Sequence, residues 1–206
     1  LDGNLFRFIP RLGYAAGDVL REVATRLLGD QTLGDAKIPC GVIVSDLYAP
    51  EDGAKLLSSW TTPKVLAADA LVATVAIPLA FSPQTVRGLD LGNRKLCDGG
   101  CTKNFPLDEL DDVPTRPTVG IRVKPAKGDP AKNPVRNWRS LARALFEMWM
   151  WNTNHAHNTA KSSSLLVDIP SDGDGLDFDL EPAEISRLLD EGRTAGRRAI
   201  PQALAL

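Results

Sequence analysis

The first strongly patterned segment of the chain has the period of an amphipathic helix. In segment 17–30, GDVLREVATRLLGD, apolar residues recur every three to four positions: Val19, Leu20, Val23, Ala24, Leu27 and Leu28. Asp18 suits the N-cap of this helix, and Gly29 suits its end. Segment 38–48, IPCGVIVSDLY, then carries a continuous run of β-branched residues. This run predicts a strand buried on both faces, which is typical of a parallel sheet covered by helices.

A second helix and a hairpin are predicted next. A Thr-Pro pair at 62–63 opens a segment of small apolar residues, which predicts a helix that runs to about Thr74. Segments 85–87 and 94–97 flank a Gly-Asn turn. We expect these two segments to form a hairpin that leads into Asp98.

The second half of the chain alternates between strands and helices. Segments 117–125 and 165–170 predict strands. Residues 126–160 combine a Pro-, Lys- and Gly-rich loop with a Trp-rich segment of helical spacing, so we expect either a helix packed on the core or a surface that meets lipid. After a cap at Pro182, segment 184–199 predicts a terminal amphipathic helix.

The composition indicates one globular domain over residues 1–206. Hydrophobic residues make up 43% of the chain, which is enough for a core, and the formal net charge is −2 at pH 7. Because the charges are mixed, we expect no nucleic-acid binding. No apolar run reaches the roughly 20 residues that span a bilayer. We therefore expect a cytoplasmic protein or one peripheral to a membrane, not an integral membrane protein.

Several side chains that often carry chemistry are poorly placed for it. Cys97 and Cys101 lack CxxC spacing, and we expect them to be reduced and buried. The alternative is that they pair by oxidation, since they flank Asp98. His155 and His157 fall on different faces of a helix, so they do not suit a shared metal. The acidic stretch 171–179 lacks residues that an EF-hand requires, and the sequence contains no phosphate-binding glycine motif and no GxSxG elbow. We expect no cofactor and no metal.

Segment 95–106, KLCDGGCTKNFP, places a carboxylate, Asp98, directly before Gly99 and Gly100. Two glycines allow positive φ and a close approach of the backbone, so the side chain before them can be aimed out of a strand end. The simple alternative is a hairpin turn in which Asp98 makes an Asx hydrogen bond. Under that alternative, Asp98 would be exposed and away from any cleft.

Three segments, in this order, resemble the patatin-like phospholipase family: IPCGVIVSDL at 38–47, LVATVAIPLAFSP at 71–83 and CDGGCTKNFP at 97–106. Segment 175–199 resembles the terminal strand and helix of bacterial members, whereas residues 126–160 match no motif of the family. The resemblance implies an α/β fold with a mostly parallel sheet sandwiched by helices, incomplete at the N-terminus.

The resemblance also implies a function, that of a lipid acyl hydrolase with a Ser-Asp catalytic dyad, which acts on phospholipids or other acyl lipids. By this analogy Asp98 is the dyad carboxylate, with Gly99, Gly100, Asn104 and Pro106 in support. The serine and the oxyanion loop of family members lie N-terminal to the matched segments. Because this chain has no such nucleophile, we expect it to be part of a longer protein and to be inactive alone.

Two further expectations concern the environment of the site. Partial burial of Asp98 should raise its pKa toward that of a useful base. Peripheral membrane contact is best placed on Trp138, Trp149 and Trp151, which have arginines nearby. The alternative function is a non-catalytic lipid-binding or scaffold domain of the same fold. The sequence gives no indication of an oligomeric state.

Overall fold

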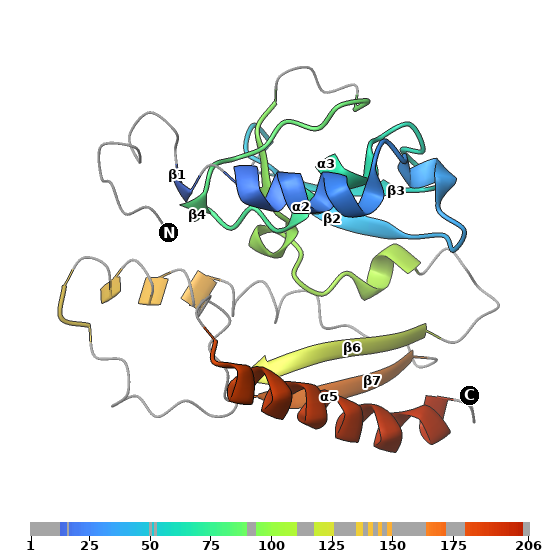
Figure 1. Cartoon of the computed structure of the whole chain (residues 1–206), viewed down its shortest axis with the longest axis vertical. Helices are drawn as coiled ribbons and strands as arrows, with labels where there is room; N and C mark the ends of the chain where they lie inside the picture. Colours follow the sequence, from blue (N-terminus) through green and yellow to red (C-terminus); the bar gives the residue numbers. More distant parts are fainter. Residues whose placement is uncertain are drawn as a thin grey trace. The chain divides into compact units, whose positions relative to one another are not determined.

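The computed structural model describes residues 13–15, 17–49, 51, 53–89, 94–110, 118–125, 135–137, 140–141, 144–145, 148–149, 164–171 and 180–203. Contacts divide the chain into two compact units, the first within residues 1–106 and 149–155, the second within residues 107–148 and 156–206 (Figure 1). That residues 1–206 form a single domain stays a prediction.

A three-stranded sheet in the order β3-β2-β5 forms the centre of the first unit. The strands are β2 (Gly41–Asp46), β3 (Ala54–Ser58) and β5 (Leu96–Asp98). The predicted buried strand is confirmed, because the last four residues of β2 are buried. Its predicted parallel pairing is wrong, since β2 is antiparallel to both neighbours. A buried run of residues shows that a strand is covered on both faces, but it does not show whether the strand is parallel or antiparallel to its neighbours. The connection from β2 to β3 is short, and a short connection suits an antiparallel pair.

Two helices pack together beside this sheet, α2 (Asp18–Leu28) and α3 (Ala67–Thr74) (Figure 1). The helix predicted at 17–30 is confirmed, and it ends at Gly29, which has φ 57°. Its N-cap is Gly17 and not the predicted Asp18, which is instead the first helical residue. An acidic residue in the first turn still interacts favourably with the helix dipole.

Only half of the apolar stripe on α2 is covered. Leu20, Ala24 and Leu28 belong to a cluster with Ala68 and Val72 of α3. The other three apolar residues are exposed, namely Val19, Val23 and Leu27. The period of the sequence therefore predicted the helix correctly, but it predicted a wider buried face than the first unit provides.

Helix α3 ends at Thr74 as predicted, but it begins at Ala67, several residues after Pro63. The carbonyl oxygens of Pro63 and Val65 accept hydrogen bonds from the N–H groups of Gly34 and Leu33, which lie in the 3-10 helix η1 (Leu33–Asp35). These bonds to a distant segment hold residues 63–66 outside the helix. At the other end, the hydroxyl of Thr74 donates to the carbonyl oxygen of Ile43 at 2.6 Å, which ties α3 to β2.

The first unit also contains a parallel pair, β1 (Gly13–Ala15) with β4 (Leu79–Phe81). The predicted hairpin is confirmed only as a single antiparallel bridge between Gln84 and Leu96. Residues 85–87 form no strand, although Val86 is buried in the core cluster of the sheet. The Gly-Asn turn at 92–93 lies outside the described residues.

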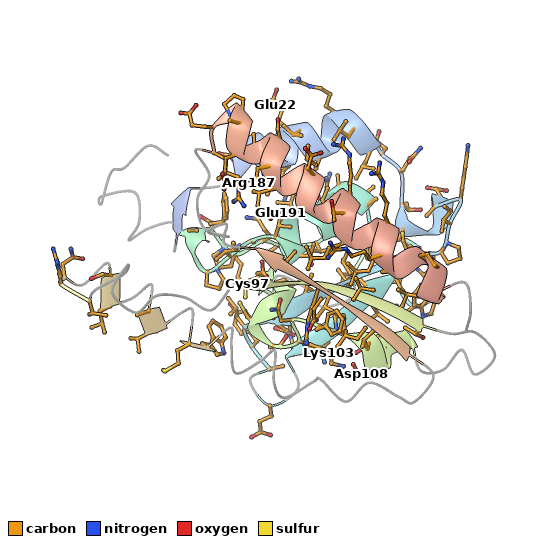
Figure 2. All side chains as sticks on the ribbon, turned by 90° about the horizontal axis from the view of Figure 1, so that it is seen from below. Glu22, Cys97, Lys103, Asp108, Arg187 and Glu191 are labelled. Carbon is orange, nitrogen blue, oxygen red and sulfur yellow. The ribbon has the colours of Figure 1, made fainter. Side chains whose placement is uncertain are left out.

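The second unit contains β6 (Thr118–Pro125), β7 (Ser164–Ser171) and α5 (Pro182–Ala203), together with the 3-10 helix η3 (Leu107–Leu110). The two strands are parallel, and α5 packs along β7 (Figure 1). Both predicted strands and the terminal helix are thereby confirmed. Figure 2 shows Arg187 and Glu191 one turn apart on α5, where they form an ion pair.

In the Trp-rich segment, the described residues from 140 to 149 are helical. The large apolar side chains among them are exposed: Leu141, Leu145, Met148 and Trp149. This exposure disagrees with a helix packed on the core. The loop 126–134 and the residues Trp138 and Trp151 lie outside the described part of the chain.

Candidate active site

Asp98 is the last residue of β5, and main-chain contacts fix it from two elements. Val44 of β2 is its partner in the antiparallel register. The N–H of Asp98 donates to the carbonyl oxygen of Ala76, two residues after α3, at 3.0 Å. A strand and a helix end therefore determine where this carboxylate leaves the backbone.

The two glycines after Asp98 form the 3-10 turn η2 (Gly99–Cys101). Oδ1 of Asp98 accepts a hydrogen bond from the N–H of Gly100 at 2.7 Å, which is the Asx bond expected of a simple turn. The carbonyl oxygen of Gly99 accepts from the N–H groups of Thr102, at 3.1 Å, and Lys103, at 2.9 Å. The turn thus has its own hydrogen bonds in addition to those that hold Asp98.

Gly99 is required by a close approach and not by positive φ. Within the described residues, the glycines with positive φ are Gly17, Gly29 and Gly88, so this part of the prediction is wrong for Gly99 and Gly100. A β-carbon at Gly99 would lie 2.2 Å from the carbonyl oxygen of Ile43, far inside contact distance. The absence of a side chain is therefore what allows the turn to lie against β2.

Asp98 is half-buried, which differs from the exposed carboxylate that the simple-turn alternative predicted. Burial raises the pKa of Asp98 above its ordinary value of 3.8, and the bond from Gly100 only partly offsets this. The predicted direction of the shift is confirmed. Oδ2 accepts no hydrogen bond from the part of the chain that the structure describes. One carboxylate oxygen is thus held while the other is open to a donor.

Two hydroxyl groups that the sequence analysis missed, those of Ser45 and Thr102, are hydrogen-bonded beside the Asp98 turn. The hydroxyl of Ser45, in β2, donates to the carbonyl oxygen of Asp98 at 2.7 Å. Oγ1 of Thr102 lies 2.7 Å from Oγ of Ser45. Only the register of β2 against β5 brings these residues together, and no local pattern in the sequence indicates that register.

The other residues predicted around Asp98 lie in or beside the same turn. Asn104 and Pro106 are half-buried in the segment that follows η2. Cys97 and Cys101 are buried free thiols, as predicted. A hydrogen bond with Cys97, together with burial, raises the pKa of the Cys101 thiol. Both residues belong to the buried core.

Comparison with known proteins identifies the family of this chain. The model of the patatin-like phospholipase family matches residues 1–111, more than half of the 206 residues. The chain belongs to the patatin-like phospholipase family. It is also 27% identical over 184 residues to the uncharacterized protein YqhO of Bacillus subtilis strain 168, an alignment that covers 85% of this chain and 60% of YqhO. The chain thus spans about three-fifths of the length of that relative.

The patatin-like match includes the whole Asp98 turn and its supporting strand and helix. The parallel pairs and the helices beside the sheets are compatible with the α/β fold of the family. The match ends before residues 126–160, in agreement with the lack of a family motif there. The alignment with YqhO extends further along the chain than the family match does.

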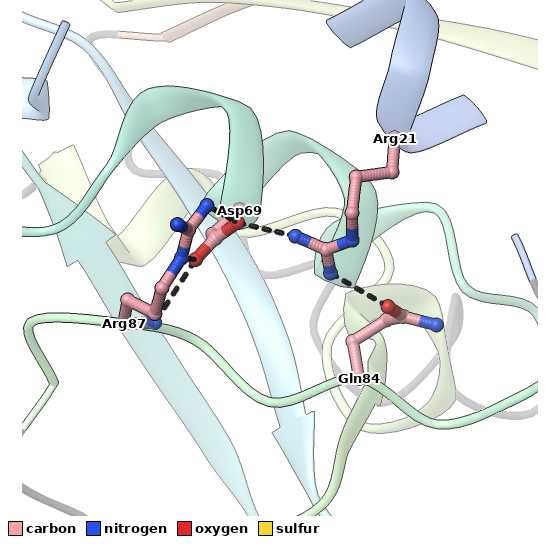
Figure 3. A network of polar contacts seen from close by, with 4 residues as sticks. All are labelled: Arg21, Asp69, Gln84 and Arg87. Atoms are coloured by element: carbon pink, nitrogen blue, oxygen red, sulfur yellow. Dashed lines mark hydrogen bonds and ion pairs between the residues drawn. The ribbon is translucent and has the colours of Figure 1, made fainter. Parts of the chain in front are cut away.

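A second buried carboxylate, Asp69 of α3, lies in this patatin-like unit and was not predicted (Figure 3). Oδ2 of Asp69 accepts from Nε of Arg87 at 2.8 Å, and Oδ1 forms an ion pair with Arg21 of α2. Arg21 also donates to the side chain of Gln84 at 2.8 Å. Burial raises the pKa of Asp69, but the bonds and charges of Arg87 and Arg21 outweigh burial and lower it overall.

Asp69 therefore differs from Asp98 in its chemistry. Its two oxygens are bonded to arginines, so it is held as an anion and joins α2, α3 and the segment around Arg87. Asp46, at the end of β2, is likewise buried and paired with Arg94 at 2.7 Å. Both carboxylates are structural ion pairs, whereas Asp98 has no cationic partner among the described residues.

Several other predictions concern residues outside the described ranges. His155, His157 and residues 172–179 lie outside them. Within the described ranges, no group of three metal-ligating side chains occurs. Of the helices that the structure describes, none has the length and apolar character needed to cross a bilayer.

Proposed function

We propose that this chain supplies the general base of a Ser-Asp dyad in a lipid acyl hydrolase, with Asp98 as the base. The observation that carries the proposal is the state of its carboxylate: Oδ1 is held by Gly100, Oδ2 has no donor in the described structure, and burial raises the pKa. A carboxylate in this state is ready to accept a proton from a hydroxyl group. Membership of the patatin-like phospholipase family supports an acyl lipid as the substrate.

The nucleophile in this proposal is a serine from outside these 206 residues, because the sequence has no GxSxG elbow. In the first step, Oδ2 of Asp98 accepts the proton of the serine hydroxyl while the serine oxygen attacks the ester carbonyl carbon. When the tetrahedral intermediate collapses, the ester C–O bond breaks and the leaving alcohol takes the proton from Asp98. In the second half of the reaction, Asp98 accepts a proton from water while the water oxygen attacks the acyl-enzyme, and the serine oxygen takes this proton back as the fatty acid leaves.

Asp98 suits this role better than the other buried carboxylates of the first unit. Although burial raises the pKa of Asp46, the N–H of Tyr48 and the side chain of Arg94 occupy its two oxygens and lower that pKa overall. Burial also raises the pKa of Asp69, but its arginines lower it overall. A useful base at neutral pH has a pKa moved toward the working pH, which is the direction of the shift at Asp98. The dyad also needs no histidine, and the two histidines of the chain carry no part of the proposal.

The test is the hydrolysis of a short acyl ester, such as p-nitrophenyl butyrate, by the complete protein that contains this chain. Asp98→Asn keeps the shape of the side chain but removes the base, so we expect kcat to fall by about 10²- to 10⁴-fold. Asp190→Asn, on the exposed face of α5, is the matched control and should leave kcat unchanged. Wild-type activity in a folded Asp98→Asn variant would exclude the dyad.

An assay with phospholipid vesicles and the complete protein judges the alternative, a non-catalytic lipid-binding or scaffold domain. Such a domain would bind phospholipid vesicles without releasing fatty acid in the wild type. A complete protein that releases fatty acid, and loses this release on Asp98→Asn, excludes the scaffold. Binding without any turnover would favour it.

A further inference from the structure

Ser45 is a buried polar residue whose hydroxyl is bonded to the backbone of Asp98 and to the side chain of Thr102. It lies in the buried half of β2 with only 2% of its surface exposed. Its hydroxyl donates to the carbonyl oxygen of Asp98 at 2.7 Å, 53 residues along the chain. A buried hydroxyl needs a partner, and here the partner is the main chain of the candidate base.

The direction of the hydrogen bonds follows from counting protons. A carbonyl oxygen only accepts, so the single hydroxyl proton of Ser45 is committed to Asp98. Oγ of Ser45 must then accept from Oγ1 of Thr102, 2.7 Å away. The other acceptor near Thr102, the carbonyl oxygen of Gly99, is farther at 3.4 Å. The result is a directed chain from Thr102 to Ser45 to the Asp98 carbonyl.

This series of hydrogen bonds, from Thr102 through Ser45, adds a third restraint on Asp98. Its N–H is bonded to Ala76, its carbonyl oxygen to Ser45 and its Oδ1 to the N–H of Gly100. Among these three restraints, the first and last use main-chain partners, which no substitution of a side chain removes. The bond from Ser45 is the one supplied by the side chain of another residue, and its loss removes that donor from the carbonyl oxygen of Asp98.

We propose that Ser45 and Thr102 are positioning residues, which aim the open oxygen of Asp98 by fixing the peptide that follows it. The proposal rests on the proposed function, since it assigns a role in the same site. Ser45 is not itself the nucleophile, because its proton is given to a main-chain carbonyl and the residue is buried. Its effect on catalysis passes through the geometry of Asp98.

The chain offers a matched control in Ser58 at the end of β3. Ser58 is as buried as Ser45, with 0% of its surface exposed, and its hydroxyl lies 2.7 Å from Oγ1 of a threonine, Thr61. Its hydroxyl also accepts from the N–H of Thr61, and it makes no bond to the Asp98 turn. Ser58→Ala thus removes an equally buried hydroxyl in the neighbouring strand.

The first measurement compares Ser45→Ala and Ser58→Ala in the complete protein, with p-nitrophenyl butyrate as the substrate. For Ser45→Ala we expect kcat to fall about 10- to 100-fold with KM within about twofold, because a base displaced by a fraction of an ångström loses its alignment. For Ser58→Ala we expect kcat to be unchanged in the folded protein. An equal fall of kcat in both variants would show a merely structural role and overturn the proposal.

The second measurement does not depend on turnover. The titration of the Asp98 carboxyl carbon by NMR should show a lower pKa in Ser45→Ala than in Ser58→Ala, since a loosened turn admits water. Identical titrations would overturn the proposal. If Asp98→Asn leaves hydrolysis intact, the proposed function fails, and this titration still decides whether Ser45 holds the carboxylate.

A second variant keeps the test decisive if Ser45→Ala does not fold. Thr102→Val keeps the branched shape of the residue and removes the donor to Ser45. We expect the same changes in kcat and in the titration, of smaller size, because the bond from Ser45 to Asp98 remains. A folded Thr102→Val protein with the kcat and the Asp98 titration of the wild type would overturn the role of Thr102 and the directed chain.

Discussion

Gly99 lies so close to Ile43 that a β-carbon on Gly99 would stand 2.2 Å from the Ile43 carbonyl oxygen and 2.9 Å from the Ile43 β-carbon. Both clashes involve β2, whose backbone is fixed by strands on either side. The contact therefore sets how closely the Asp98 turn approaches the sheet.

Gly99→Ala should consequently destabilise the protein and displace Asp98. We expect a loss of about 1–3 kcal/mol in the free energy of unfolding, the usual cost of overpacking. Urea denaturation measures this loss. Gly192→Ala is the control, because a β-carbon there meets open space, and alanine should favour α5 by up to about 1 kcal/mol. Equal stabilities for Gly99→Ala and wild type would contradict the close contact.

The raised pKa of Asp98 predicts a specific dependence of stability on pH. Above its ordinary pKa of 3.8 the unfolded chain loses this proton, while the folded protein still holds it. The folded state then binds more protons, so this group makes stability fall as pH rises through the window between the two pKa values.

Asp98→Asn removes that contribution. Relative to wild type, the variant should gain stability as pH rises above 3.8, and the gain should level off once the folded carboxyl has ionised. Urea midpoints of both proteins from pH 3 to 7 measure the difference. A gain that shrinks with rising pH would mean that the pKa of Asp98 is lowered instead.

The Asp69 network predicts the opposite dependence. Arginines hold the pKa of Asp69 below 3.8, so the stability that it contributes is present above that pH and is lost as pH falls through the folded pKa. Asp69→Asn should cost about 1–3 kcal/mol at pH 7, because the buried side chain loses hydrogen bonds to arginines that are themselves partly exposed.

Two comparisons check the Asp69 prediction by urea denaturation. The difference between wild type and Asp69→Asn should narrow in acid. Glu22→Gln, which breaks an exposed pair with Arg26 on α2, should change stability by less than about 0.5 kcal/mol. A similarly small effect of Asp69→Asn would show that the network adds little.

The three cysteine thiols should differ in their reactivity toward a thiol reagent. Cys40 is exposed, whereas Cys97 and Cys101 are buried. We expect DTNB to titrate one of the three cysteines in the native protein and all three in denaturant. Cys40→Ser should abolish the native reaction. Rapid native labelling of Cys97 or Cys101 would show that the Asp98 turn opens readily.

The chain alone should not react with a fluorophosphonate probe, because it contains no GxSxG serine. Mass spectrometry of the intact chain after labelling checks this. The complete protein should give one adduct, outside these 206 residues. A stoichiometric adduct on any serine of this chain would refute the proposed location of the nucleophile.

The elements that the sequence predicted best are those with a strong period or composition of their own. The stripe of α2, the β-branched run of β2 and the terminal helix α5 are each visible in consecutive residues. The start of α3 was misplaced because Pro63 and Val65 are held by Leu33 and Gly34, some thirty residues earlier. A local pattern contains no information about such a competing partner.

The same limit applies to the site. Asp98 was found because its motif is contiguous, and family resemblance gave it a role. Ser45 was missed because its meaning depends on the register of β2 against β5, and the direction of β2 was itself predicted wrongly. A buried serine in a strand has no feature that distinguishes it until its partner is known.

The bond between Ser45 and Asp98 also has a consequence for folding. It closes a loop of 53 residues, and β2 must already lie beside β5 before the carboxylate is in place. Contacts of such long range form at a high cost in chain entropy and tend to slow folding. The ion pair of Arg21 with Asp69, which joins α2 to α3, spans 48 residues and carries a similar cost. The NMR signal of the Asp98 carboxyl should therefore report, during folding, whether β2 and β5 have paired.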